Sequence, residues 1–208
     1  MATAEKIDLY KKYKNEYITP KNPALVTISQ AKYLSINGRG VPGGPEFKDK
    51  IGALYAVAFT IKMTRKFAGL QDYAVCKLEG QWWLDGSKQD FSCVSPDKWN
   101  WKLMIRTPDI IKETDLQKAL SALIAKGKSS LVREVVLESI SEGQCVQMLH
   151  VGPYDQEKKT IALMKDVAEQ NGVEFYGKHH EIYLSDPRRV PPERLRTILR
   201  EPVRTKGV

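Results

Sequence analysis

The stretch EGQCVQMLHVGPYDQEKKTIALMKDVAEQNG, residues 142–172, predicts a strand, a tight loop and a helix in immediate succession. β-branched and apolar residues run up to His150, and Gly152-Pro153 then interrupts the strand. The apolar spacing from residue 157 onward is that of an amphipathic helix. Asn171-Gly172 is a favourable C-cap for it. A strand that feeds a helix through so short a loop indicates an α+β unit.

The same order occurs earlier in the chain. LSINGRGVPG, residues 34–43, and MLHVGPYD, residues 148–155, both end a strand in a Gly-Pro loop, and IGALYAVAF and TIALMKDVA both open the helix that follows. A repeated unit of about a hundred residues predicts two α+β modules packed against each other. We therefore expect one domain over residues 1–208, with module one at about 22–90, a connector at about 91–130 and module two at about 131–208. Such a duplication favours a ligand cleft where the modules meet.

Other segments carry weaker patterns. Four further strands are predicted: residues 26–28, residues 32–37, a run that includes Trp99 to Ile105, and the segment KHHEIYLSD. Three further helices are predicted: a short one within residues 5–17, one that includes Ile51 to Ala58, and one over residues 116–126 that is capped by Thr114. DYAVCKLEGQWWL predicts a hairpin with its turn at Glu79-Gly80.

Composition and charge limit the class of protein. The chain has 208 residues, of which 42% are hydrophobic and 28% charged, and a net charge of +8. It has neither a secretory leader pattern nor an apolar run that could span a bilayer, so we expect a cytoplasmic protein. Cys76, Cys93 and Cys145 have the pattern of reduced core cysteines rather than of a disulfide framework or zinc site. The basic residues are dispersed and accompany no nucleic-acid-binding motif, which makes direct nucleic-acid binding an unfavoured hypothesis.

Several stretches together resemble the GyrI-like small-molecule-binding family, in particular its stand-alone members. They are PKNPALVTI, YLSINGRGVPG, ALYAVAFTIKM, EGQWWL, WNWKLMIRTPD, EGQCVQMLHVGPYDQE and GKHHEIYLSDPRRVPPERLRTILREPV. They cover nearly the whole chain in the expected order.

The resemblance implies a fold and an activity. The implied fold is α+β, with two βαββ modules in a pseudo-two-fold arrangement, antiparallel sheets and an inter-module ligand cleft. Regulators of this class bind cationic, flat aromatic drugs there, above a glutamate on the last strand. Stand-alone relatives are hydrolases that open the cyclopropane of DNA-alkylating compounds.

The predicted strand KHHEIYLSD has two faces. Residues two apart in a strand share a face, so His180, Ile182 and Leu184 form the expected core face, and His179, Glu181 and Tyr183 the expected cleft face. The resemblance places the pocket glutamate at Glu181. This carboxylate would either neutralise a cationic ligand or activate a water molecule. A solvent-exposed glutamate paired with a lysine is the simpler alternative.

Aromatic side chains are the candidate walls of the cleft. The set that we expect to contact a ligand is Trp82, Trp99, Trp101, Tyr183, Phe59, Met104 and His179. Rings from different elements that converge on one space form a cage for a planar or cationic ligand, although core packing explains each ring taken singly. Tyr55 carries a hydroxyl that could donate to a ligand carbonyl.

No metal or cofactor is expected. His179 and Glu181 share a strand face, but His180 points the other way and His150 is distant in sequence, so three convergent ligands are not evident. The loop GRGVPGGP matches neither a Walker sequence nor a dinucleotide fingerprint. The arginine-rich segment after Asp186 has the pattern of a solvated face.

The leading hypothesis is therefore a detoxifying hydrolase with Glu181 and Tyr55 as catalytic residues. Water polarised by Glu181 would open a cyclopropane ring while the Tyr55 hydroxyl stabilises the developing negative charge. The alternative is a module that binds, sequesters or senses drugs without turnover, with a gyrase contact implied by family analogy alone. A DNA-binding protein is a third class, and it requires a salt-dependent affinity.

Overall fold

The computed structural model describes residues 5–86 and 91–207, and its chain forms two compact units. Unit 1 comprises residues 1–12, 31–78 and 82–140, and unit 2 comprises residues 13–30, 79–81 and 141–208. Each unit is thus assembled from separate segments of the chain. The module boundaries expected from the sequence stay a prediction, and the first, at residue 90, lies outside the described residues.

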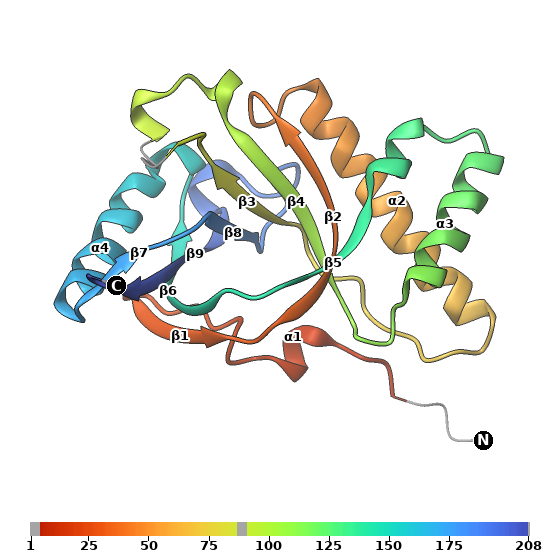
Figure 1. Ribbon diagram of the computed structural model, residues 1–208, viewed down its shortest axis with the longest axis horizontal. Helices are drawn as coiled ribbons and strands as arrows, with labels where there is room; N and C mark the ends of the chain where they lie inside the picture. The colour runs from red at the N-terminus through yellow and green to blue at the C-terminus, as the bar shows by residue number, and fades with distance from the viewer. Residues whose placement is uncertain (1–4, 87–90, 208) are drawn as a thin grey trace. The chain divides into compact units, whose positions relative to one another are not determined.

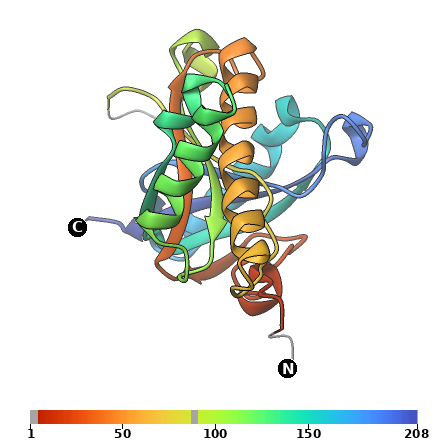
Figure 2. The ribbon, with the colours of Figure 1, turned by 90° about the vertical axis from the view of Figure 1, so that its right-hand side faces the viewer.

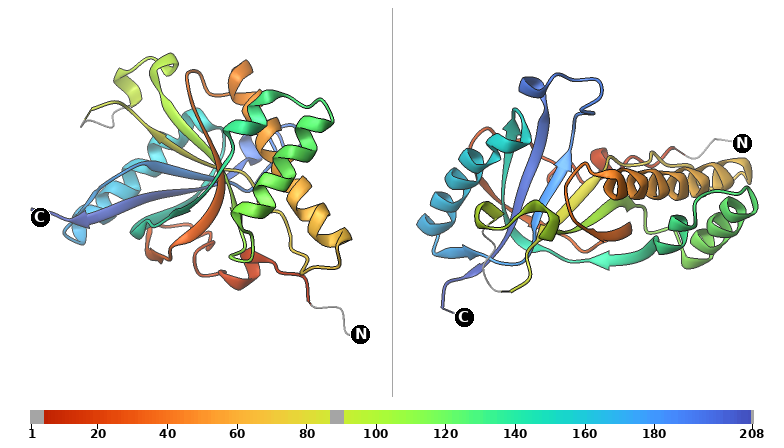
Figure 3. Two further views of the ribbon diagram at one scale, coloured as in Figure 1. Left: turned by 45° about the vertical axis from the view of Figure 1, so that its right-hand side comes forward. Right: turned by 90° about the horizontal axis from the view of Figure 1, so that it is seen from above.

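Unit 2 is built on antiparallel strands. In this unit β6 pairs with β1 on one side and with β9 on the other, and β9 pairs in turn with β8 and β7 (Figure 1). The elements are β1 Ala24–Ile28, β6 Gly143–Val151, η4 Tyr154–Gln156, α4 Glu157–Gln170, β7 Val173–Phe175, β8 His179–Tyr183, η5 Pro192–Arg194 and β9 Arg196–Thr205. Residues 184–195 connect β8 to β9 and project beyond the ends of these two strands (Figure 3).

Helix α4 covers one face of this sheet. Its Met164 and Ala168 are buried against Val146, Met148 and Leu199, which β6 and β9 contribute. The helix ends at Asn171, whose side chain donates to the Val167 carbonyl at 2.8 Å. Gly172 follows with φ +69°, a left-handed conformation that glycine adopts without strain. The predicted helix and its C-cap are confirmed.

Unit 1 contains three antiparallel strands in the order β4, β2, β5 and the long helix α2. The elements are α1 Leu9–Lys12, β2 Ala31–Arg39, α2 Pro45–Phe67, η1 Phe91–Cys93, η2 Pro96–Lys98, β4 Asn100–Thr107, α3 Glu113–Ala125, η3 Ser130–Glu134 and β5 Val136–Ile140. Helices α2 and α3 lie side by side (Figure 2), and Arg65 of α2 pairs with Asp115 of α3 at 3.1 Å. Strand β3, Glu79–Trp83, has its first three residues in unit 2 and its last two in unit 1.

A large ring against a glycine fixes the pairing of β2 with β4. Gly38 lies directly opposite Trp101 in the register. A Cβ atom at Gly38 would lie 2.0 Å from Trp101 Cη2, so the indole occupies the space that any side chain would need. Trp101 is 1% exposed, and its Nε1 donates to the Gly40 carbonyl at 3.2 Å. Gly38 is therefore required by packing.

The α+β class and the antiparallel sheets predicted from the sequence are confirmed. The repeated stretches are also strand, loop and helix in both places: nine-residue β2 leads to α2, and nine-residue β6 leads to α4.

Three local predictions were wrong. Glu79 and Gly80 are the first residues of β3 and not a hairpin turn, because the preceding residues 74–78 form no strand. Thr114 does not cap α3; the cap is Lys112, whose N–H donates to Asp115 Oδ2 at 2.9 Å. Trp99 lies at the end of η2, outside β4.

The cysteines and the helices complete the comparison with the sequence. Cys76 and Cys145 are buried, reduced thiols as expected, whereas Cys93 is exposed because it lies in the short turn η1. Among the helices of residues 5–86 and 91–207, none has the length and apolar character needed to cross a bilayer.

We expect Gly38→Ala to lower the free energy of unfolding by roughly 1–3 kcal/mol, because the new methyl group overlaps the Trp101 ring. Urea denaturation followed by tryptophan fluorescence measures the change. Gly52→Ala is the matched control: Gly52 lies inside α2, and beyond the backbone of that helix nothing lies within 4 Å of the place that a Cβ would take, so it should gain up to about 1 kcal/mol. Equal unfolding midpoints for Gly38→Ala and wild type would contradict the packing argument.

Candidate functional site

Strand β8 separates two groups of polar side chains. In its register with β9, His180 pairs with Arg200 and Glu181 pairs with Leu199. Directly paired residues lie on the same face of a sheet. His179, Glu181 and Tyr183 therefore share the face of Leu199, which α4 covers, and His180 and Ile182 share the opposite face with Arg200. The alternation expected from the sequence is present.

The first group, the Glu181 cluster, comprises Glu157, His179, Glu181 and Glu201, with Tyr154 and Tyr183 beside them. His179 lies between two carboxylates: its Nδ1 is 2.5 Å from Glu201 Oε1 and its Nε2 is 3.3 Å from Glu181 Oε1. The three side chains are only 10–12% exposed. Glu181 is thus largely buried beside His179 and is not a solvated strand residue.

Helix α4 adds Glu157 to this cluster from its first turn. Glu157 is 7% exposed, and its Oε1 has no hydrogen-bond partner among the described residues. A carboxylate oxygen of Glu157, a ring nitrogen of His179 and a carboxylate oxygen of Glu181 all lie within 4.8 Å of one another. Four ionisable groups therefore meet in a largely buried space.

Burial and like charge shift the protonation of this cluster. Burial, and then the neighbouring Glu181 carboxylate, raise the pKa of Glu157 well above its usual range. Burial alone would lower the pKa of His179, but the carboxylates of Glu201 and Glu181 outweigh it and raise that pKa well above 6.5. Both shifts favour the protonated forms of Glu157 and His179.

Two tyrosines flank the carboxylates. The rings of Tyr154 and Tyr183 meet edge to face with centroids 5.9 Å apart. Burial, followed by the charge of Glu181, raises the pKa of Tyr154 to about 12 and that of Tyr183 well above 10. Both hydroxyls therefore stay protonated and can donate hydrogen bonds.

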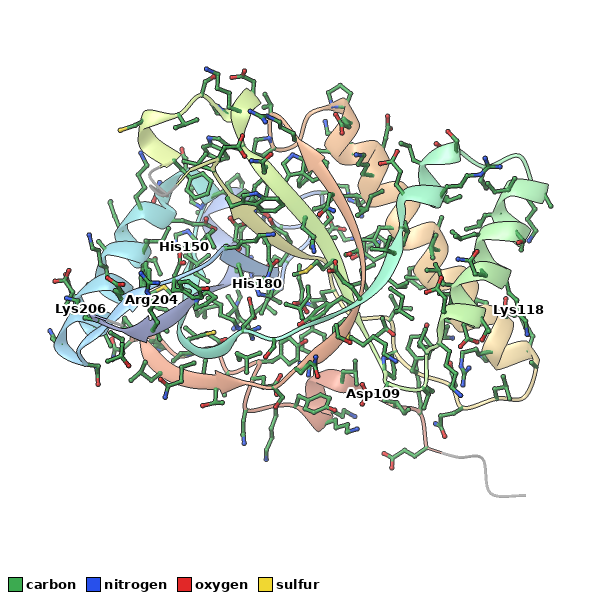
Figure 4. The ribbon with its side chains drawn as sticks, in the orientation of Figure 1. Asp109, Lys118, His150, His180, Arg204 and Lys206 are labelled. Carbon is green, nitrogen blue, oxygen red and sulfur yellow. The ribbon has the colours of Figure 1, made fainter. Side chains whose placement is uncertain are left out.

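The second group, the His180 network, lies on the opposite face of β8 and comprises Glu79, Glu142, Gln147, His180 and Arg200. His180 (Figure 4) is held between two carboxylates, with Nε2 3.0 Å from Glu79 Oε2 and Nδ1 2.9 Å from Glu142 Oε1. The Tyr17 hydroxyl also donates to Glu79, at 3.1 Å. The face of β8 that carries His180 and Ile182 is thus buried, as expected, but it contains an ionisable side chain, His180, with two carboxylate partners.

Arg200 completes the His180 network. It donates to Gln147 at 2.8 Å, to Glu142 at 3.1 Å and to the Glu16 carbonyl at 2.6 Å, and it is 0% exposed. Burial alone would raise the pKa of Glu142, but His180 and Arg200 outweigh it and lower that pKa to about 2. Burial alone would lower the pKa of His180, but Glu142 and Glu79 raise it to about 9. These groups are fully ion-paired, which is typical of a structural network.

Unit 1 carries an aromatic group, the tryptophan cluster, which comprises Phe47, Trp82, Phe91, Trp99 and Trp101. Phe47 stacks on Trp82 at 5.7 Å and meets Trp101 edge to face at 5.0 Å. Trp99 contacts both Trp82 at 6.4 Å and Phe91 at 4.9 Å. Three of the predicted ligand-contacting residues are therefore brought together. Trp82 Nε1 is buried and has no hydrogen-bond partner among the described residues, so a donor remains available in this cluster.

The remaining predicted residues of unit 1 lie apart from that cluster. Tyr55 and Phe59 stack on α2 with centroids 6.0 Å apart, and Phe59 is 51% exposed. Met104 is 0% exposed and packs with Ala31 and Tyr33 on the face of β4 opposite Trp101. The ligand contacts expected of these residues stay predictions.

Several charged residues were missed because their partners are remote in sequence. Arg200 has the sequence context of a solvated arginine, yet 53 positions separate it from Gln147, its partner. Glu157 begins a helix, where a glutamate is ordinary. His150 is no member of the Glu181 cluster, since its ring nitrogens contact Thr160 at 2.9 Å and the Pro153 carbonyl at 3.2 Å. Only the alternation around Glu181 gave a sequence signal.

The chain matches a known family over most of its length. The family described as GyrI-like small molecule binding domain matches residues 21–204. Among curated proteins, none is significantly similar to this chain.

Solved structures from Listeria innocua are similar over nearly the whole chain. An uncharacterized conserved protein shares 38% identity with a TM-score of 0.88, over 96% of this chain and 100% of its own. A protein described as a hydrolase shares 36% identity with a TM-score of 0.85, over the same fractions. A second hydrolase structure shares 36% identity with a TM-score of 0.87, also over 96% and 100%.

We expect the His180 network to make the free energy of unfolding decrease as the pH is lowered into the acid range. Because the pKa of Glu142 is lowered from 4.5 to about 2, its contribution is present above pH 4.5 and is lost as pH falls through 2. That shift corresponds to roughly 3 kcal/mol. Glu142→Gln should therefore unfold more easily than wild type at pH 7, by a difference that shrinks toward pH 2. Denaturant titrations between pH 2 and pH 7 measure it, and a difference independent of pH would contradict the assignment.

Proposed function

Because the chain belongs to the family of GyrI-like small-molecule-binding domains, we propose that it binds a hydrophobic aromatic compound with an electrophilic cyclopropane and opens that ring with water. The ring would be conjugated to a dienone, as in DNA-alkylating compounds. The cellular role would be detoxification in the cytoplasm. The hydrolase description of Listeria innocua proteins 36% identical to this chain supports an enzyme over a binding module.

The observation that carries the proposal is the environment of Glu181. Its carboxylate is 12% exposed, lies 3.3 Å from the His179 ring and stands beside protonated tyrosines. A carboxylate removed from bulk water and fixed by a neighbour is suited to take a proton from a bound water molecule. Its position on a strand gives it a fixed direction.

The chemistry that we propose is a single displacement. The water oxygen bonds to the CH₂ carbon of the cyclopropane while Glu181 accepts the water proton. The ring C–C bond breaks, and its electron pair passes through the dienone to the carbonyl oxygen, which becomes a phenolate and is then protonated. The product is the substrate plus one water. Relief of ring strain and aromatisation drive the reaction, so the protein has to bind and orient the compound.

Two residues of unit 1 would support this step. The Tyr55 hydroxyl is the proposed donor to the carbonyl oxygen, where negative charge develops. Trp82 stacks with Phe47, and its indole N–H has no hydrogen-bond partner among residues 5–86 and 91–207. It would contact the aromatic part of the ligand together with Trp99 and Trp101. Phe59, Met104, His179 and Tyr183 complete the proposed ligand contacts. Tyr55 belongs to unit 1 and Glu181 to unit 2, and their action on one ligand is part of the proposal.

A binding protein without turnover is the alternative. It would sequester or sense cationic aromatic drugs, with Glu181 as a fixed counter-charge. The family's description, small-molecule binding, agrees with it equally well.

Glu181→Gln tests the role of the carboxylate. We expect turnover to fall by about 10²–10⁴-fold, because the amide cannot accept the proton of water. The protein is incubated with a cyclopropane-bearing alkylator, and the hydrated product is followed by mass spectrometry, while quenching of tryptophan fluorescence measures binding. Glu169→Gln, an exposed change on α4, is the control and should behave as wild type. Stoichiometric binding by wild type with no product would leave only the binding module.

Tyr55→Phe tests the second catalytic assignment. Removing a donor to the developing phenolate should lower kcat by about 10²–10³-fold with a smaller change in KM. Steady-state kinetics at varied substrate concentration separate the two. An unchanged kcat would show that another group stabilises the carbonyl oxygen.

A further inference from the structure

The Glu181 cluster has the ligand set of a divalent metal site. Glu157, His179 and Glu181 each place one donor atom within 4.8 Å of the others. Carboxylate oxygen and imidazole nitrogen are the donors that zinc accepts at about 2.0–2.2 Å. No metal was expected from the sequence, because only His179 and Glu181 share a strand face. Helix α4 supplies the third ligand, Glu157.

The distance between two of these atoms already fits a bound ion. Two ligand atoms of a tetrahedral ion at about 2.0–2.1 Å are about 3.3–3.4 Å apart. His179 Nε2 and Glu181 Oε1 are separated by 3.3 Å. The Glu157 donor atom lies within 4.8 Å of both, which makes it the candidate for the third corner.

The other ring nitrogen of His179 has the partner that a metal-bound histidine requires. Nδ1 lies 2.5 Å from Glu201 Oε1. When Nδ1–H donates to a carboxylate, the lone pair of the imidazole is on Nε2, and the ring is held in one orientation. Glu201 is 8% exposed and comes from β9, so the orienting group is itself fixed in the sheet.

Glu157 gives an independent indication that a ligand is bound. A carboxylate oxygen that is buried without a partner is costly, and Glu157 Oε1 has none among the described residues although the residue is only 7% exposed. The three carboxyl groups of Glu157, Glu181 and Glu201 face the imidazole of His179, a set that a divalent cation would balance.

We propose that Glu157, His179 and Glu181 bind a divalent first-row transition-metal ion, with Zn²⁺ the preferred one, and that Glu201 positions His179. The ion is coordinated by Glu157, His179 Nε2 and Glu181, which leaves a fourth position for water or a ligand oxygen. A bound metal ion lowers the pKa of its water ligand, so such a water would be a nucleophile in its own right. This inference does not rest on the ring opening proposed above, because metal binding is measured without substrate. With an ion bound, Glu181 would be a metal ligand and not a free base, so zinc binding would replace the water activation proposed above.

Calorimetric titration of chelator-treated protein with ZnCl₂ tests the site. Cys93→Ser is used as the background, since the exposed thiol is an alternative zinc ligand. We expect the background protein to bind one equivalent of Zn²⁺. Glu157→Gln and His179→Gln should lose that binding, and Glu201→Gln should bind Zn²⁺ about 10–100-fold more weakly. Glu169→Gln changes the same charge at an exposed position of α4 and should bind as the background does.

Two further measurements distinguish loss of the metal site from misfolding of a variant. Zn²⁺ should raise the melting temperature of the background protein and leave that of Glu157→Gln unchanged. Co²⁺ should give the visible d–d bands of a four- or five-coordinate site, which disappear in His179→Gln. Equal zinc binding by the background and Glu157→Gln, or no binding of Zn²⁺, Co²⁺ or Mn²⁺, would overturn the proposal. A cationic organic ligand bound equally well after His179→Gln, with no metal bound, would show that the carboxylates serve an ammonium-type group instead.

Discussion

The register between β8 and β9 is the constraint on which the polar chemistry of unit 2 depends. It pairs His180 with Arg200 and so places His179 beside Glu201 on the other face. A slip of one residue would exchange the faces of two adjacent histidines. Each would then meet the other's partners: His179 would face Arg200, and His180 would face the apolar side of α4. The register is therefore fixed by charge as well as by the apolar residues Ile182, Ile198 and Leu199, all of which are fully buried.

His179 and His180 have similar carboxylate neighbours, but the polar groups around them differ in how many of their hydrogen bonds are made. Each imidazole lies between two carboxylates, yet His180 belongs to a network in which Arg200 and Tyr17 supply further donors and Gln147 a further acceptor. Such a closed network rigidifies the sheet because every buried charge has a partner. In the Glu181 cluster, Glu157 Oε1 has no hydrogen-bond partner within the part of the chain that the structure describes. Unsatisfied buried groups in an otherwise satisfied structure are where binding and chemistry are expected.

The sequence predicted most of what depends on local periodicity. The strand and helix of residues 142–172, the C-cap at Asn171-Gly172 and the alternation around Glu181 follow from spacing that is visible in one segment. The resemblance to a known family added the class of ligand. Thr114 failed as a cap because the backbone N–H of Lys112 pairs with Asp115, and several residues can begin a helix equally well. The hairpin at Glu79-Gly80 failed because a short apolar run before a turn dipeptide has no unique strand partner.

What could not be predicted are contacts between residues that are distant in the chain. His180 meets Glu79 across 101 positions, and Arg200 meets the Glu16 carbonyl across 184. The sequence does not show which of the 25 acidic residues pairs with His180, nor which backbone carbonyl accepts from Arg200. Only the folded sheet makes the choice, by bringing the N-terminal segment 13–20 and strands β6, β8 and β9 into one unit.

The stretch that specifies the fold also supplies the site. Residues 142–172 contribute Glu142 and Gln147 to the His180 network, and Tyr154 and Glu157 to the Glu181 cluster. The Gly-Pro loop sets the point at which α4 begins, and the first turn of that helix brings Glu157 to β8. Glu157 precedes Met164 by seven residues and Ala168 by eleven, and at about 100° per residue the side chains of Met164 and Ala168 both lie on the same side of α4 as that of Glu157, within about 20° of it. Burial of Met164 and Ala168 against the sheet therefore also turns Glu157 toward the sheet, and the short loop sets where along the sheet this carboxylate lies.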